Sequence, residues 1–273
     1  MNGVVGFVVP HVGGDRSWVD GALAAAQTLR SEGLEVEVVP GTPAALPGHW
    51  AVAVAHGIQY EALVRARPDR AQRVVLSDRP ATPTDANVTS VDWSWHLGGR
   101  AAGAAAGLIA REQGRTGPVG LVAGPTVDTQ LRFADAFARG LRAADPRRAL
   151  EVRFVTAFDD VAQGAAAGVS MTDGAGCALV AHSADSAGMA ATAAAADRGV
   201  PTIGFLSGID AHVAAVTSDI TGVLVRLVRE AVAGRPTPSL YVCSLESGDV
   251  GLALADGVGE DIAARVRELA ATG

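Results

Sequence analysis

Three apolar runs of this chain end in a histidine. The runs VVGFVVPH, AVAVAH and ALVAH end at His11, His56 and His182, and each is typical of a short buried strand. The carboxyl ends of parallel strands meet at one edge of a sheet, which is where ligands of such sheets bind. Imidazoles at that edge can hold a polar ligand or move its protons. The sequence therefore predicts a site at strand ends that uses these three histidines.

The residues alone leave three roles open for these histidines. They can contact a ligand, or they can bond backbone groups at the strand ends as purely structural residues. They can also act as catalysts beside a carboxylate, His11 with Asp15 and His182 with Asp185. An enzyme of that kind would be a cofactor-independent acid–base catalyst, a hydrolase, lyase or isomerase.

Aromatic residues fall close to the same segments. Trp18, Trp93 and Trp95 are three of only four tryptophans, and His96 follows the last of them. Ligand pockets are commonly walled by aromatic side chains, so these residues favour a flat aromatic or heterocyclic ligand. Packing in a hinge or core is the alternative role for them. The two remaining histidines are expected in loops or at the surface, namely His49 and His212.

The sequence lacks the motifs of several kinds of chemistry. No HxH, HxxxH or HExxH spacing occurs, so we expect no metal. GxGxxG, GxxxxGK[ST] and GxSxG are likewise missing, so we expect no cofactor and no serine-hydrolase or ATPase chemistry. The chain contains no lysine, which rules out a Schiff-base mechanism. A net charge of −7 argues against a nucleic-acid partner.

The opening residues run directly into a strand pattern. They show no basic region, no long apolar region and no lipobox cysteine, and no apolar stretch of the sequence is long enough to span a bilayer. We therefore expect a cytoplasmic protein without membrane insertion, the alternative being a chain whose export leader has been removed. Cys177 and Cys243 lie in apolar contexts and are expected to be buried thiols, with a disulfide left open. A homo-oligomer is also left open.

Strand and helix patterns alternate along the chain. With 49% hydrophobic and 19% charged residues, 273 residues can bury a substantial core. Strands alternating with helices indicate βαβ units and parallel sheets. About ten strands are expected, too many for one sheet of this size, so we predict two Rossmann-like α/β lobes with a boundary near residues 90–95. The expected strands are 4–9, 36–39, 51–55, 74–77, 88–91, 119–122, 152–156, 178–181, 202–205, 213–217 and 240–244.

The order of several motifs resembles the BMP/PnrA-like family of basic membrane lipoproteins and nucleoside-binding proteins. The segment Asp15-Arg16-Ser17-Trp18 resembles the family's Asp-x-Ser-Phe, and FDDVAQGAA at 158–166 resembles its Phe-x-Asp-x-x-x-Gly. The segments around AVAVAHG, ARPDRAQRVVLSD, NVTSVDW, GPVGLVAGPTVDTQLRFADAFARG, AHSADSAG and SGDVGLAL match further family motifs in sequence order. The resemblance spans nearly the whole chain.

This resemblance implies a type 1 periplasmic-binding-protein fold, with two lobes joined by a hinge and a ligand in the cleft. Residues 1–92 plus about 207–238 would form the N-terminal lobe, and 93–206 plus about 239–273 the C-terminal lobe. Family members bind a purine nucleoside with stacked aromatic residues. The ligand contacts expected here, from the resemblance and the residue types together, are His11, Asp15, Ser17, Trp18, His56, Gly57, Asp78, Trp93, Trp95, His96, His182, Ser183, Phe205 and Leu206.

Two departures from the family pattern bear on the ligand. The family's Ile-Gly-x-Asp, whose acid binds ribose hydroxyls, corresponds here to Ile203-Gly204-Phe205-Leu206, and its lysine falls near Thr221. Leucine cannot accept those hydrogen bonds, each worth about 1–3 kcal/mol. We therefore expect a small-molecule binding protein whose ligand is not held as a standard nucleoside. An enzyme that uses the same fold and an importer's solute receptor are the alternatives.

Overall fold

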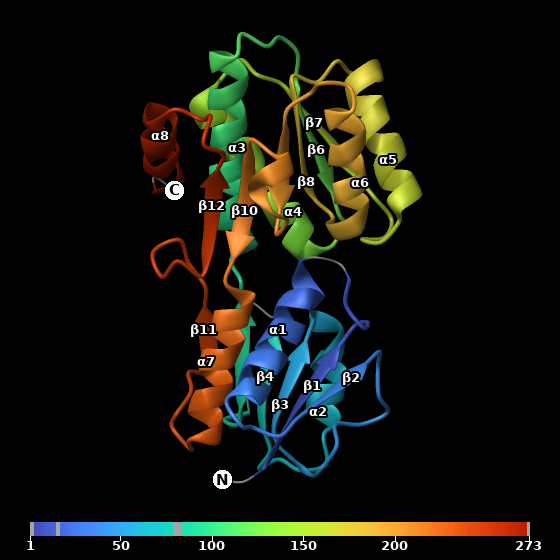
Figure 1. The fold of residues 1–273 in the computed structure, drawn as a ribbon, viewed down its shortest axis with the longest axis vertical. Coiled ribbons are helices and arrows are strands. Elements are labelled where there is room, and N and C mark those ends of the chain that lie inside the picture. Colours follow the sequence, from blue (N-terminus) through green and yellow to red (C-terminus); the bar gives the residue numbers. More distant parts are fainter. Residues whose placement is uncertain (1–2, 15–16, 79–82, 84, 272–273) are drawn as a thin grey trace. The chain divides into compact units, whose positions relative to one another are not determined.

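The computed structural model describes residues 3–14, 17–78, 83 and 85–271. They form two α/β units, each built around a six-stranded sheet (Figure 1). The predicted class of two mostly parallel α/β sheets is confirmed. One unit comprises Met1–Ser94 and Asp219–Asp249, and the other comprises Trp95–Ser218 and Val250–Gly273. The chain therefore changes unit three times.

The three points of exchange differ from the expected residues 92, 206 and 238. Residues 207–218 stay in the second unit because β10 (Ala214–Ser218) pairs with β9 (Thr202–Phe205). Residues 239–249 stay in the first unit because β11 (Leu240–Val242) pairs with β5 (Val88–Asp92). Strand pairing sets both boundaries, and a local sequence pattern does not reveal which sheet a strand will join.

The first sheet is parallel throughout, in the order β11-β5-β4-β3-β1-β2. Its strands are short and apolar because both faces of the sheet are covered. Their carboxyl ends share one edge, so a residue that follows any of these strands is placed at that edge. The remaining strands are β1 (Val4–Val9), β2 (Val36–Pro40), β3 (Trp50–His56) and β4 (Arg73–Ser77).

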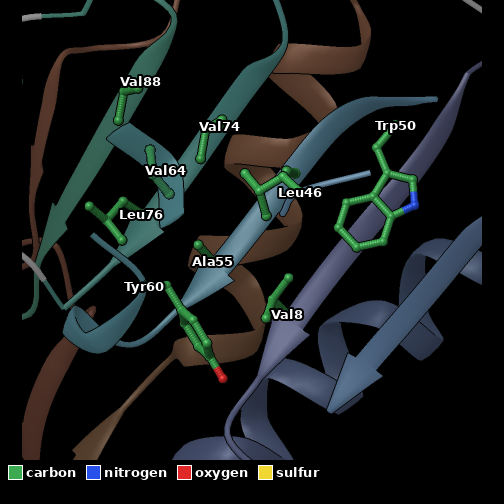
Figure 2. Close-up of a cluster of buried hydrophobic side chains, with 10 residues drawn as sticks. Val8, Leu46, Trp50, Ala55, Tyr60, Val64, Val74, Leu76 and Val88 are labelled. Atoms are coloured by element: carbon green, nitrogen blue, oxygen red, sulfur yellow. The ribbon is translucent and has the colours of Figure 1, made fainter. Parts of the chain in front are cut away.

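Helices cover both faces of this sheet. Helix α1 (Trp18–Ser31) packs against α7 (Ile220–Val232), and Thr221 Oγ1 donates to Gly21 O at 3.0 Å. The other face carries α2 (Glu61–Ala66), preceded by the 3-10 turn η1 (Ile58–Tyr60). Figure 2 shows the apolar cluster beneath α2, to which alternate residues of adjacent strands contribute. It comprises Val8, Leu46, Trp50, Ala53, Ala55, Tyr60, Val64, Val74, Leu76 and Val88.

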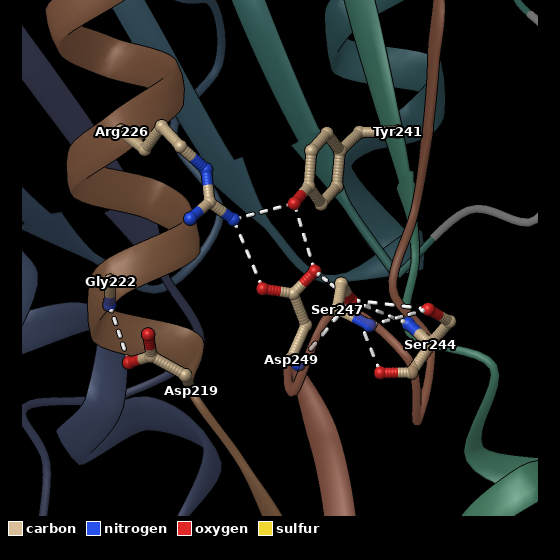
Figure 3. A network of polar contacts seen from close by, with 7 residues as sticks. All are labelled: Asp219, Gly222, Arg226, Tyr241, Ser244, Ser247 and Asp249. Atoms are coloured by element: carbon tan, nitrogen blue, oxygen red, sulfur yellow. Dashed lines mark hydrogen bonds and ion pairs between the residues drawn. The ribbon is translucent and has the colours of Figure 1, made fainter.

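A polar network holds the last segment of the first unit (Figure 3). Asp249 is 3% exposed and accepts hydrogen bonds from Arg226 of α7 at 3.0 Å, from the Tyr241 hydroxyl of β11 at 2.8 Å and from Ser247 at 2.6 Å. Burial alone raises the pKa of Asp249, but hydrogen bonds from Ser247, Tyr241 and Arg226 outweigh it and leave the pKa below its usual value. Asp219 caps α7 through Gly222 N at 2.8 Å.

The second sheet has the order β12-β10-β9-β8-β6-β7. All of its strands are parallel except β12 (Val250–Leu254), which runs antiparallel to β10 and is not among the expected strands. Its sequence, VGLAL, has only partly buried residues after Val250, which makes its apolar pattern weak. The other strands are β6 (Val119–Ala123), β7 (Leu150–Phe154) and β8 (Leu179–Ser183).

Two pairs of helices pack on this sheet. Helix α3 (Trp95–Glu112) packs on α4 (Asp128–Ala144), and α5 (Val161–Val169) packs on α6 (Asp185–Ala196) (Figure 1). A Cβ on Gly103 would lie 2.0 Å from Phe137 O, and one on Gly140 would lie 2.0 Å from Arg100 O. Glycine is therefore required for the close approach of α3 and α4. The π turn η2 (Ser170–Gly174) follows α5, the 3-10 turn η3 (Ile209–Ala211) follows β9, and α8 (Glu260–Ala271) ends the described chain.

Within the described residues, no helix combines the length and the hydropathy needed to cross a membrane.

Candidate functional site

Most of the residues predicted to bind ligand in the first unit lie at the carboxyl edge of its sheet. His11 follows β1, His56 ends β3, Asp78 follows β4 and Trp93 follows β5. Gly57 follows His56 with φ +138°, a conformation that favours glycine. Parallel pairing of these four strands brings the predicted residues to one edge. Asp15 lies outside the described residues, and Ser17 is buried immediately before α1.

Trp18 and His56 form a stacked pair at this edge. Their ring centroids are 3.8 Å apart with an interplanar angle of 22°, and Trp93 meets Trp18 edge-on at 5.7 Å. His56 is fully buried, and its Nε2 pairs with Trp18 O at 3.0 Å. Trp93 is 1% exposed and donates from Nε1 to Ser77 Oγ at 3.0 Å. His56 and Trp93 thus support Trp18, whose half-buried indole retains contact with solvent.

His11 is exposed, unlike the other two strand-end histidines. Its Nδ1 accepts a hydrogen bond from Gly13 N at 3.2 Å, which orders the turn after β1. The structure therefore gives His11, His56 and His182 different environments, although their sequence contexts are alike.

His182 is enclosed in the second unit near the carboxyl end of β8. It is 1% exposed, and its Nε2 accepts from Phe205 N at 3.2 Å. The imidazole packs against α6 at Gly188. Only glycine fits at this position, because a Cβ there would lie 2.1 Å from His182 Nδ1. Burial, with a smaller contribution from nearby His212, lowers the pKa of His182 to about 3. The imidazole is therefore neutral at physiological pH and acts as an acceptor for backbone.

His212 lies in the loop between η3 and β10, half-buried beside His182. The two ring centroids are 6.3 Å apart, and burial also lowers the pKa of His212. Its Nδ1 lies 2.8 Å from Thr202 Oγ1 and its Nε2 lies 3.2 Å from Ser207 Oγ. The expected loop position is confirmed, and the side chain is half-buried there because its ring nitrogens lie against Thr202 of β9 and Ser207.

Aromatic residues gather at the same edge of the second sheet. Phe205, the last residue of β9, meets Trp95 at 5.3 Å and Phe133 at 5.5 Å, both in edge-to-face contacts. Phe205 is 6% exposed, whereas Trp95 is half-buried. His96 follows Trp95 in the first turn of α3, and its Nδ1 lies 3.5 Å from Arg132 of α4. Each unit therefore has one half-buried tryptophan packed on a buried ring.

The described non-glycine residues with left-handed backbone all follow strand ends. They are Asp78 (φ 69°) after β4, Ser94 (φ 48°) after β5, Asp185 (φ 38°) after β8 and Leu206 (φ 54°) after β9. Such conformations cost free energy and gather at functional sites. Three of these residues are predicted site residues, and Ser94 is the fourth, between Trp93 and Trp95.

Sequence reasoning missed Gln130 of α4. Its Oε1 accepts hydrogen bonds from Gly124 N at 3.0 Å and from Ser183 Oγ at 2.7 Å, so it joins the carboxyl ends of β6 and β8. Gln130 is 7% exposed and lies on the buried face of its helix with Phe133, Phe137 and Leu141. A polar residue at the apolar helical spacing is the signal that could have identified it.

No group of three or more His, Cys, Asp or Glu side chains suited to a metal ion occurs in the described part of the chain. Cys177 and Cys243 are both free and buried, in different units. Burial raises the pKa of Cys177 to about 11 and also raises that of Cys243, so both thiols are protonated and unreactive at neutral pH.

Several solved structures share this fold. A solute-binding protein of an ABC transporter system from Aeropyrum pernix K1 has a TM-score of 0.77 at 21% identity, covering 97% of this chain and 85% of that one. A second, from Conexibacter woesei DSM 14684, has a TM-score of 0.71 at 23% identity, covering 98% and 95%. A transcriptional activator of the comK gene from Bacillus halodurans has a TM-score of 0.79 at 16% identity, covering 99% and 97%. These likenesses concern the fold.

No curated protein gave a significant match to the sequence. A family model described as the PnrA-like ABC transporter substrate-binding protein matches residues 65–232, more than half of the chain. The match includes the strand ends that carry His182, Ser183 and Phe205. The resemblance of the motifs is thereby confirmed, and the chain belongs to the Bmp family of PnrA-like substrate-binding proteins, with a type 1 periplasmic-binding-protein fold.

Proposed function

We propose that this protein binds a small, flat aromatic or heterocyclic solute through residues at the carboxyl ends of its parallel strands. The observation that carries the proposal is the half-buried tryptophan in each unit: Trp18 on the ring of His56, and Trp95 on the ring of Phe205. A supported indole is an ordered surface for stacking, so little side-chain entropy is lost when a flat ring binds. Membership of a substrate-binding family supports a small-molecule ligand.

The same site is proposed not to hold a nucleoside through its ribose. Leu206, where the family pattern has an acid, supplies no side-chain acceptor for hydroxyl groups. Its backbone is fixed by Leu206 N donating to Val216 O at 2.8 Å and has φ 54°. The base portion of a ligand would therefore carry the affinity.

Calorimetry with hypoxanthine, inosine and D-ribose tests this function. We expect hypoxanthine to bind, inosine to bind no more tightly, and D-ribose not to bind. Stacking is worth about 1–3 kcal/mol per ring, so Trp18→Leu and Trp95→Leu should each weaken hypoxanthine binding about tenfold or more. Trp50→Phe is the matched control, because Trp50 is buried at the amino end of β3 and donates to Glu37. Tight D-ribose binding, or no binding by any heterocycle, would contradict the proposal.

Acid–base catalysis at the same residues is not favoured by a comparable observation. His182 is neutral, buried and already engaged with Phe205 N. The protein should leave hypoxanthine and inosine unchanged during long incubation followed by chromatography. Turnover that is lost in both His11→Ala and His182→Ala would show instead that the protein is an enzyme.

The cellular role is a separate part of the proposal. A cytoplasmic protein of this kind would sense, buffer or carry a metabolite, whereas an exported one would deliver it to an importer. Of these two roles we propose the cytoplasmic one. Fractionation of the host cells checks it, and recovery of the protein in the periplasmic or membrane-associated fraction would favour the importer's receptor.

A further inference from the structure

We infer that Gln130 is a specificity-determining residue that donates its side-chain amide to a carbonyl oxygen of the solute. The inference rests on the proposed function and extends it by assigning a hydrogen-bonding chemistry to the second unit. Neither the family match nor the sequence pattern assigns a role to this residue.

The orientation of the Gln130 carboxamide is fixed by its partners. Gly124 N is a backbone donor, so the atom 3.0 Å from it must be the acceptor oxygen of the amide. Ser183 donates its hydroxyl proton to the same oxygen at 2.7 Å. With both partners on Oε1, the NH2 group cannot exchange places with the oxygen without leaving Gly124 N facing another donor.

The NH2 group of Gln130 has no acceptor among the residues described. The side chain is 7% exposed as a whole, yet Nε2 is not sealed from solvent. Gln72 shows the opposite use of a buried amide, because its Nε2 donates to Pro47 O at 3.0 Å and to Trp50 O at 2.9 Å. A donor that is held rigidly, reaches solvent and is left unused by the protein is suited to an acceptor on a ligand.

The Gln130 amide lies at the carboxyl edge of the second sheet, beside the other candidate site residues of that unit. Its two partners lie at the carboxyl ends of β6 and β8, where Ala123 pairs with Ser183. The next strand of the sheet, β9, ends in Phe205, which contacts half-buried Trp95. The amide donor and the aromatic pair therefore occupy the ends of three adjacent strands.

Two carboxylates at the starts of neighbouring helices favour a neutral acceptor. Asp128 and Asp185 lie in the first turns of α4 and α6, the two helices that follow β6 and β8. Carboxylates at these positions disfavour an anionic group on the ligand. A ring carbonyl of a flat heterocycle supplies an acceptor without a charge.

Gln130→Glu tests the inference with little structural disturbance. Glutamate keeps the oxygen that Gly124 N and Ser183 need, but replaces the NH2 donor with an acceptor. Hypoxanthine presents a carbonyl acceptor, and adenine presents an amino donor at the same ring position. We expect the wild-type protein to prefer hypoxanthine, and the ratio of the two affinities to shift toward adenine by at least tenfold in the variant. Benzoate, an anionic acceptor, should bind neither protein.

Gln163→Glu is the matched control. Gln163 occupies the same place near the start of α5, and its Oε1 accepts from Thr156 N at 2.6 Å just after β7. It reproduces the structural role of Gln130 at the edge strand of the sheet, so its replacement should leave the affinity ratio unchanged. A lowered melting temperature in Gln130→Glu with an unchanged ratio would mean that Gln130 is only structural.

Nuclear magnetic resonance gives a direct second measurement. The side-chain NH2 signals of Gln130 are assigned as those missing from Gln130→Glu, and hypoxanthine should shift them in the wild-type protein. If hypoxanthine binds without shifting them, the role of Gln130 is overturned while the proposed function stands. If none of the heterocycles binds the wild-type protein, the proposed function fails and this inference fails with it.

Discussion

At the scale of single residues, burial decides what each strand-end histidine does. His56 pairs with Trp18 O and stacks on its ring, and His182 accepts from Phe205 N. Both therefore order backbone that carries neighbouring aromatic residues. Because burial lowers the pKa of His182, protonation of this imidazole at low pH opposes folding.

Acidification should destabilise the second unit through His182. Its pKa is about 3 in the folded state and about 6.5 in an unfolded chain, so the unfolded state binds the extra proton between these values. The free energy of unfolding should therefore fall by up to about 1.4 kcal/mol per pH unit below pH 6.5. Urea titrations at pH 6.5 and pH 5 should show a loss of about 2 kcal/mol from this group.

His182→Gln should flatten that pH dependence, because glutamine can accept from Phe205 N and does not titrate. His49→Gln is the control, since exposed His49 pairs with Glu37 at 3.1 Å in the other unit. An unchanged pH slope in His182→Gln would count against a neutral buried imidazole. Burial also lowers the pKa of His212, so protonation of His212 likewise destabilises the fold at low pH. Part of the pH dependence of stability should therefore persist in His182→Gln.

At the scale of elements, most of the parallel strands are predictable from sequence because they are short apolar runs between helices. Val4–Val9 is one example, where the expected bounds agree with β1. The antiparallel strand β12 is different, since it is an edge strand with weak apolar character and depends on pairing with β10. The candidate site is likewise only partly predictable. The sequence predicts which residues lie at strand ends, but the partners of His56 and Gln130 are set by tertiary packing.

The contact between α3 and α4 depends on glycine, and Gly140→Ala should disrupt it. The added methyl group would lie 2.0 Å from Arg100 O. This is a backbone atom, so no side-chain rotation can relieve the clash. Overpacking of this kind costs about 1–3 kcal/mol and outweighs the gain in helix propensity. Denaturant titration of the second unit should show this loss.

Gly174→Ala is the control for that substitution. The nearest atom to its added Cβ is Ser170 Oγ at 3.8 Å, so stability should stay within about 0.5 kcal/mol of the parent. Equal stability of both alanine variants would show that α3 and α4 can move apart at little cost.

At the scale of the whole molecule, the chain changes unit at residues 94, 218 and 249. Two of these points adjoin Asp219 and Asp249, and Asp219 N donates to Asp249 O at 3.0 Å. This hydrogen bond therefore joins the first and last residues of the segment 219–249, where the chain enters the first unit and where it leaves. This arrangement makes Asp249 a determinant of how well α7, β11 and the segment after β11 stay joined.

Asp249→Asn should destabilise the first unit. An asparagine amide cannot accept from Arg226, Tyr241 and Ser247 together, so at least one buried polar group loses its partner. We expect a loss of about 1–3 kcal/mol in chemical denaturation followed by tryptophan fluorescence. Asp173→Asn, which affects an exposed ion pair with Arg198, should cost less than about 1 kcal/mol. A similar effect of the two substitutions would contradict the role given to Asp249.

The placement of β11 and β12 in different sheets has a consequence for synthesis. Residues 240–254 supply an outer strand to each sheet, and α8 packs on α3 only after them. A nascent chain emerging from the ribosome therefore cannot complete either sheet until this late stretch has left the exit tunnel. Until then both sheets are incomplete and have an unpaired edge. Chaperones and neighbouring chains can bind these edges during that period.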